Sequence, residues 1–191
     1  ATKVSRPNIG LTSNGVVHQV IDIMVPPSLI QSFEQGLEDS ASPTTFTTLL
    51  SYLRLSGMLS TVLGPPGPHT LLAPTDEAFA LVSEERKNEW TSNMTALREM
   101  LERHIVSMNI AIANQFDRYK TTSGAVGNSL NLQAPSLAGT TLRINVTSDT
   151  SGTVVGVINN GESSTVGSEI LVADGVVQGI DRVLGMDGSV R

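Results

Sequence analysis

The chain has no cysteine, no long apolar run and no cluster of basic residues. Without cysteine it can form no disulfide, no thiolate metal site and no cysteine nucleophile. Its apolar runs are a few residues long, whereas a membrane-spanning helix needs about 20. Twelve Lys and Arg against 18 Asp and Glu give a formal net charge of -6. This balance argues against nucleic acid as a partner, because such binding depends on neutralising phosphates.

Length and apolar content suit one globular domain. The chain has 191 residues, of which 39% are hydrophobic and 16% are charged. That much apolar surface can offset the entropy lost on ordering the backbone, and two ordinary domains would need a longer chain. We therefore expect one main domain.

A near-repeat lies toward the two ends of the chain. Residues 14–22 read NGVVHQVID and residues 174–181 read DGVVQGID, with one extra residue in the first copy. Copies about one domain length apart are typical of tandem modules. We therefore interpret residues 1–27 as the closing strand of a preceding domain plus a Pro-Pro linker, and residues 28–191 as one complete domain. The alternative is a chance similarity between two buried strands.

The first copy belongs to an apolar run from Val16 to Val25. An unpaired strand edge of this kind tends to aggregate. We expect the segment to pair with a sheet, in this chain or in a neighbour. Docking of residues 1–27 on a neighbouring chain would favour a structural subunit of a multi-protein complex.

Short amphipathic helices account for the apolar spacing of the first half of the chain. Gly57 ends one of them, and the Gly64–Pro68 loop interrupts the pattern. Thr75 or Asp76 begins a later helix, because either side chain can accept hydrogen bonds from free amide groups. The expected order is a helix from Ser28, a helix from residues 42–44 to Gly57, a helical turn at 58–63, a strand at 69–73, and helices that begin near residue 76, at residues 83–85 and at Thr95.

After Ser107 the chain becomes rich in β-branched and turn residues. Asn160-Gly161 between two apolar runs predicts a hairpin. Strands are expected at residues 142–146, 155–157, 169–173 and 176–184. Helices come mostly first and strands later, which indicates an α+β fold with a mainly antiparallel sheet.

Three segments, in order, carry a resemblance to a known family. They are Thr70–Phe79 (TLLAPTDEAF), Met100–Val106 (MLERHIV) and Asp174–Leu184 (DGVVQGIDRVL). Together they resemble the fasciclin (FAS1) domain of cell-surface and matrix proteins, over roughly residues 42–185. The resemblance implies a wedge of β-strands flanked by short helices, with no cofactor. It also implies roles in cell adhesion, matrix organisation or assembly on a partner surface, in proteins often built from tandem domains.

The resemblance also implies contact residues. In the family the helix of the middle segment ends in a Tyr-His pair, a region implicated in integrin recognition in some members. Here Arg103 replaces the Tyr and His104 remains, so these two residues and Asp76 of the first motif are the candidate binding residues. The residues themselves favour structural roles: His104 lies on an apolar helix face, and Asp76 suits a strand-to-helix corner.

Two sequons, Asn93-Met94-Thr95 and Asn145-Val146-Thr147, are candidate glycosylation sites. Asn93 precedes an expected helix and should be exposed, whereas Asn145 lies in an expected strand. We expect a glycan at Asn93 if the protein is eukaryotic and secreted.

The sequence contains no catalytic motif that we could identify. His18, His69 and His104 occur with many serines, but without a nucleophile elbow, a metalloprotease helix, a phosphate-binding loop or a calcium loop. We therefore expect no enzyme, no metal and no cofactor. The favoured interpretation is an extracellular protein-interaction module, secreted or on the cell surface, although a lumenal or periplasmic compartment remains open. The alternative is a small-ligand or glycan-binding domain with a groove between helices and sheet.

Overall fold

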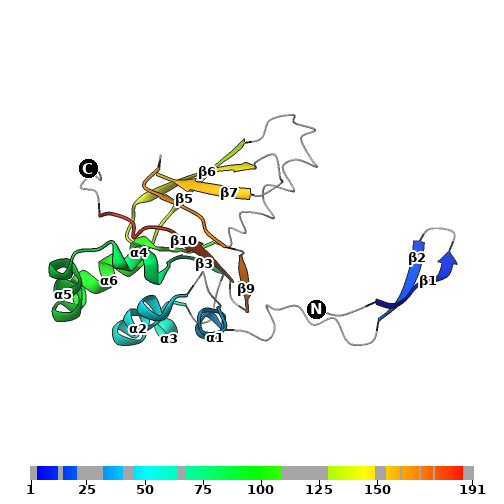
Figure 1. Cartoon of the computed structure of the whole chain (residues 1–191), viewed down its shortest axis with the longest axis horizontal. Helices are drawn as coiled ribbons and strands as arrows, with labels where there is room; N and C mark the ends of the chain where they lie inside the picture. Colours follow the sequence, from blue (N-terminus) through cyan, green and yellow to red (C-terminus); the bar gives the residue numbers. More distant parts are fainter. Residues whose placement is uncertain are drawn as a thin grey trace.

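The computed structural model describes residues 4–12, 15–20, 32–40, 45–63, 68–108, 129–148, 154–159, 161–167, 169–173 and 175–186. Within these ranges, six helices and two four-stranded sheets form the main domain. Figure 1 shows the helices on one side of the first sheet and the second sheet on its other side. The predicted α+β class is confirmed.

Side chains near the helix ends explain where most of the helices begin and stop. Ser32 and Gln35 form a reciprocal capping box at α1, and Ser83 and Asn93 cap α5 and α6. Gly57 takes a left-handed conformation (φ 73°) and ends α2, as predicted. The helices are α1 (Phe33–Glu38), α2 (Thr47–Ser56), α3 (Met58–Thr61), α4 (Asp76–Ala80), α5 (Glu84–Ser92) and α6 (Met94–Arg103).

Three predicted boundaries were wrong. Helix α2 begins at Thr47 and not at residues 42–44, because its N-terminus is capped by a side chain from elsewhere in the chain. Helix α6 is capped by Asn93 and not by Thr95, since Asn93 Oδ1 accepts from the next free amides. The last strand was expected to reach Leu184 but ends at residue 180, because the Asp181 carboxylate accepts a hydrogen bond from the Ser164 amide. The first part of the helix expected from Ser28 lies outside the described residues.

The first sheet has the order β4-β3-β10-β9 and takes one strand from each of the three sequence motifs, with the strands of the first and third motifs at its centre. Its strands are β3 (His69–Pro74), β4 (Ile105–Val106), β9 (Ile170–Val172) and β10 (Gly175–Ile180). Strands β3 and β10 pair in parallel over six residues, whereas their other neighbours are antiparallel. The Thr75 amide extends this contact by donating to the Ile180 carbonyl at 3.1 Å. The two motifs thus lie side by side, although about a hundred residues separate them.

The second sheet is fully antiparallel, with the order β5-β6-β7-β8. Its strands are β5 (Ser129–Pro135), β6 (Thr141–Ser148), β7 (Val154–Ile158) and β8 (Ser163–Ser164). The pair Ile158 and Ser163 closes the hairpin predicted around Asn160-Gly161, although Asn160 itself lies outside the described residues. Bridges from Val106 to Ser136 and from Thr165 to Ile180 join the two sheets. Together the two sheets form a wedge.

Two apolar clusters hold the layers together, and strand β3 contributes to both. Leu71 and Ala73 pack into the cluster between the first sheet and the helices. Leu72, which points to the opposite face, packs between the two sheets. A strand with apolar residues on both faces is typical of a sheet that is covered on both sides. This is why the first motif reads as a continuous apolar run.

The N-terminal residues form a separate two-stranded antiparallel sheet of β1 (Val4–Thr12) and β2 (Gly15–Val20). Strand β2 holds the first part of the apolar run that was expected to pair, and its partner is β1. The remainder of that run, from Ile21, lies outside the described residues. Within the described ranges, no helix has the length and apolar content required to cross a bilayer.

Candidate functional site

His104 lies at the C-terminal end of α6 and is completely buried. The Leu184 amide donates to its Nε2 at 2.9 Å, so Nδ1 carries the proton and donates to the Met100 carbonyl at 2.8 Å. Burial lowers the pKa of His104 to about 4 from its usual 6.5. The imidazole is therefore neutral near pH 7. It ties the end of α6 to the segment that follows β10.

Arg103, the other candidate on this helix, is half-buried, and its side chain lies against the backbone of Gly185. Gly185 has a left-handed backbone (φ 80°), and a Cβ atom there would lie 2.8 Å from Arg103 Nη1. Glycine thus allows the guanidinium to lie against the backbone. Arg103 is adjacent to His104 in sequence, yet the two side chains differ: one reaches the surface and the other does not.

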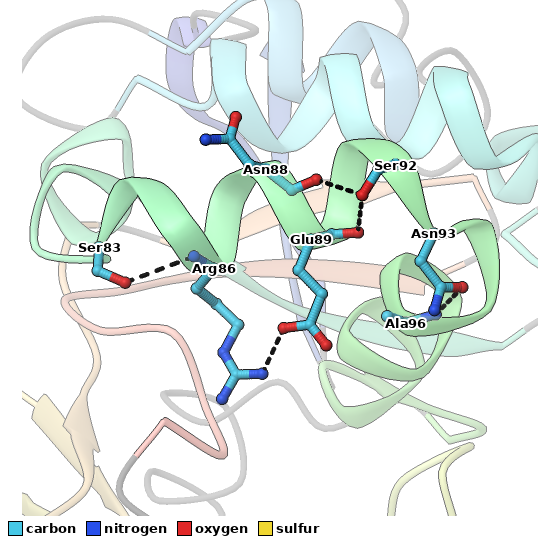
Figure 2. Close-up of polar contacts among 7 residues, drawn as sticks. All are labelled: Ser83, Arg86, Asn88, Glu89, Ser92, Asn93 and Ala96. Atoms are coloured by element: carbon cyan, nitrogen blue, oxygen red, sulfur yellow. Dashed lines mark hydrogen bonds and ion pairs between the residues drawn. The ribbon is translucent and has the colours of Figure 1, made fainter.

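A hollow of about 180 Å³ opens beside Arg103, and we call it the α5–α6 hollow. Arg86, Glu89 and Trp90 of α5, Glu99 and Arg103 of α6, and Met186 help to line it. Arg86 Nη1 pairs with Glu89 Oε2 at 2.6 Å, and Figure 2 shows both side chains extending to the same side of α5. Trp90 is almost fully buried and packs edge to face with Tyr52 and Phe79. The hollow therefore has a rigid aromatic base and a charged rim.

A second, smaller hollow lies next to the first and includes a large apolar side chain that is mostly exposed. Its volume is about 110 Å³, and Leu81, Val82, Glu162, Arg182 and Met186 help to line it. Leu81 is 71% exposed. Because Met186 lines both hollows, they are neighbours on one surface. We call this second site the Leu81 hollow.

Asp76 is occupied by contacts within the domain. Its Oδ2 accepts from the Thr47 amide at 3.1 Å and hydroxyl at 2.8 Å, and its Oδ1 accepts from the Thr48 amide at 2.8 Å. Burial raises the pKa of Asp76, but hydrogen bonds from Thr48, Thr47 and Thr45 outweigh burial and lower it to about 2. Asp76 thus caps the N-terminus of α2, where Phe46 has no capping side chain.

Both sequon asparagines are exposed. Asn93 Oδ1 accepts from the amides of Thr95 and Ala96 at 3.0 and 3.3 Å, as Figure 2 shows for Ala96. A glycan would attach to Nδ2, so capping and glycosylation use different atoms. Asn145 lies on β6, whose alternation points it outward between the buried Ile144 and Val146. Its position in a strand therefore does not bury it.

Sequence reasoning named Arg103 but missed the α5–α6 hollow beside it and the neighbouring Leu81 hollow. The described residues contain no group of three or more His, Cys, Asp or Glu that could hold a metal ion. Leu81 and Met186 belong to none of the three motifs. They line the same hollow only because of the path that the chain takes after β10. The left-handed Gly185 could have been noticed as a glycine directly after the third motif, since glycine is the usual residue for that conformation.

Two sheets that meet in a wedge, with helices covering the outer face of one, define an α+β domain of the fasciclin type. The family model of the fasciclin domain matches residues 44–186. The chain therefore belongs to the fasciclin domain family, and the resemblance carried by the three motifs is confirmed.

Several relatives resemble this chain. The transforming growth factor-beta-induced protein ig-h3 of Sus scrofa is 30% identical over 172 residues, which are 90% of this chain and 22% of the relative. Human periostin is 29% identical over 102 residues, 53% of this chain and 11% of the relative. The chain thus spans about a fifth or less of the length of these relatives. A solved FAS1 domain pair from the insect cell adhesion molecule Fasciclin I matches with 23% identity and a TM-score of 0.46, covering 71% of this chain and 40% of that one.

Proposed function

We propose that this domain is a non-catalytic protein-interaction module that acts outside the cell, in cell adhesion, matrix organisation or the assembly of a larger complex. Membership of the fasciclin family supports this proposal. The use of the motif residues supports it as well, because Asp76 caps a helix and His104 ties two segments together. Neither group is free to act as an acid, a base or a nucleophile, which catalysis would require.

The surface that we propose for binding is the one that holds the α5–α6 hollow and the Leu81 hollow. The single observation that carries this choice is Leu81, a large apolar side chain that is 71% exposed beside a charged rim. Apolar anchors surrounded by polar residues are typical of protein-binding surfaces. Arg103 is the contact residue in this proposal, and His104 positions the helix end that carries it.

The dimensions of the two hollows favour an interaction surface over a ligand carrier. Their volumes are about 180 and 110 Å³. Small-molecule sites usually measure about 300–1,000 Å³ and enclose most of the ligand. The glycan-binding or small-ligand alternative would need a deeper groove than either hollow provides.

An attachment assay tests this proposal. Wells coated with the domain would be compared with wells coated with Leu81→Glu or Arg103→Glu, using cells and matrix extract of the source organism. Loss of a central contact costs about 2 kcal/mol, so binding should weaken about thirtyfold in each variant. The matched control is Leu55→Glu, because Leu55 on α2 is also exposed, at 50%, and lines neither hollow.

Melting temperatures decide whether a loss of binding reflects contact or folding. The three variants replace exposed or half-buried side chains, so each should melt within a few degrees of the unmodified domain. If the unmodified domain binds and both hollow variants bind equally well, the proposed surface is wrong. If the unmodified domain binds neither cells nor matrix, the adhesion function is wrong.

A further inference from the structure

The N-terminal hairpin has the same pairing pattern as the hairpin that closes the domain. In β9 and β10, the pairs next to the turn are Val172 with Gly175, Leu171 with Val176 and Ile170 with Val177. In β1 and β2 they are Thr12 with Gly15, Leu11 with Val16 and Gly10 with Val17. In both hairpins the innermost pair is separated by two residues of sequence, and the second strand begins with the same Gly-Val-Val sequence. The near-repeat in the sequence is also a repeat in structure.

The surroundings of Gly175 explain why the repeated strand begins with glycine. A Cβ atom there would lie 1.8 Å from the carbonyl oxygen of His69 on the parallel strand β3, and 2.9 Å from the Phe33 ring. The residue is needed because a parallel strand packs against it. Gly15 occupies the equivalent position of β2.

The two hairpins differ in what lies on the far edge of the second strand. Strand β10 pairs with β9 on one edge and in parallel with β3 on the other. Among the described residues, β2 pairs with β1 alone. One edge of β2 therefore presents a row of backbone donors and acceptors that is available for another strand.

We propose that the open edge of β2 binds a parallel strand of the β3 type from a second fasciclin domain, so that β1 and β2 complete the first sheet of that domain. Gly15 leaves room for the carbonyl that His69 supplies in the β10 pair. The incoming strand would bind through its backbone, by parallel strand addition, and the incoming strand would carry apolar side chains on both of its faces.

The similarity to a longer protein extends into the N-terminal part of this chain. The match with ig-h3 of Sus scrofa covers 172 residues, and only residues 187–191 follow the region matched by the family model. The match must therefore include residues upstream of residue 44. This inference concerns a strand outside the α5–α6 hollow and does not depend on the proposed adhesion function.

A tethered strand tests the proposal. A second copy of residues 68–75, which contain β3, would be joined ahead of the chain by a flexible Gly-Ser linker. Such a linker raises the effective strand concentration to the order of millimolar. Alternate amides of β2 should then exchange with deuterium at least about tenfold more slowly than in the untethered chain, because paired amides exchange only after local opening. Residue-resolved exchange by NMR would measure this protection.

Two variants keep the test specific. Gly15→Val in the tethered chain should abolish the added protection, because its Cβ would meet the carbonyl of the new strand. The matched control Gly10→Val should retain it, because Gly10 lies on β1 at the position that Ile170 occupies in β9, away from the parallel partner. Leu71→Pro in the tethered copy removes a backbone donor without changing the hairpin, and it should also abolish protection.

Three results would overturn the proposal. The first is no added protection in the tethered chain while the β1 amides show that the hairpin is folded. The second is equal protection with Gly15→Val and Gly10→Val. The third is protection of β2 that rises with protein concentration in the untethered chain, because that would make a second copy of this hairpin the natural occupant of the edge.

Discussion

Replacement of His104 by alanine should destabilise the domain and remove a specific dependence of its stability on pH. The change leaves the Leu184 amide buried without an acceptor, and it empties the space that the imidazole fills. An orphaned buried donor costs about 1–3 kcal/mol, and the cavity adds to it, so we expect a loss of about 3–5 kcal/mol at pH 7.

The direction of the pH effect follows from the lowered pKa. The pKa of His104 is about 4 in the folded domain and 6.5 as a free side chain, so the unfolded chain binds the proton more tightly. Stability from this group is therefore complete above pH 6.5 and is lost as the pH falls toward 4. Each pKa unit corresponds to about 1.4 kcal/mol, which gives a loss of about 3 kcal/mol at pH 4. Burial is the main cause of the lowered pKa; the hydrogen bond to the Met100 carbonyl and the charge of Glu162 oppose it, and Arg103 adds to it.

Urea unfolding at several pH values between 4 and 7.5 measures both effects. The difference in unfolding free energy between the unmodified domain and His104→Ala should be largest near pH 7 and should shrink by about 3 kcal/mol at pH 4. Taking the difference cancels the pH dependence that the two proteins have in common. A small difference, or one that does not change with pH, would refute the buried neutral imidazole.

Two further predictions concern the first motif and the sequons. Asp76→Ala should lower the unfolding free energy by about 1–2 kcal/mol at pH 7, a value reduced for its partial exposure, whereas the exposed neighbour Glu77→Ala should have little effect. Because its pKa is about 2 and not 3.8, the Asp76 contribution should disappear as the pH falls from 4 toward 2, and an Asp76→Ala effect that persists at pH 2 would contradict it. In protein secreted by a eukaryotic host, intact mass should show a glycan on each sequon, removed by Thr95→Ala, which keeps the Asn93 cap, and by Thr147→Val. An unmodified mass would exclude glycosylation at both sites.

The helix that carries Arg103 and His104 shows how far local patterns reach. Leu97, Met100 and Leu101 form an apolar stripe at helical spacing, and these residues are buried. The same stripe placed His104 in the interior, because residue 104 follows Met100 by one helical turn. The acceptor role of its Nε2 could not be predicted, since its partner is 80 residues away at Leu184.

The start of α2 illustrates the opposite case. Pro43 and the residues around it are typical of a helix N-terminus, yet the helix begins at Thr47. The deciding group is the Asp76 carboxylate, which lies 28 residues along the chain from Thr48. A rule that reads only neighbouring residues cannot include a cap supplied from such a distance.

The sequence alone determined the fold class, the family and the near-repeat, because each depends on short-range periodicity or on motifs that survive in linear order. Only the tertiary structure decided which residues of those motifs reach the surface. Arg103 and His104 are adjacent in sequence, but the parallel pairing of β3 with β10 brings Leu184 over one and Gly185 against the other. Burial and exposure of neighbouring side chains depend on what packs above them, and that is settled by contacts between segments far apart in the chain.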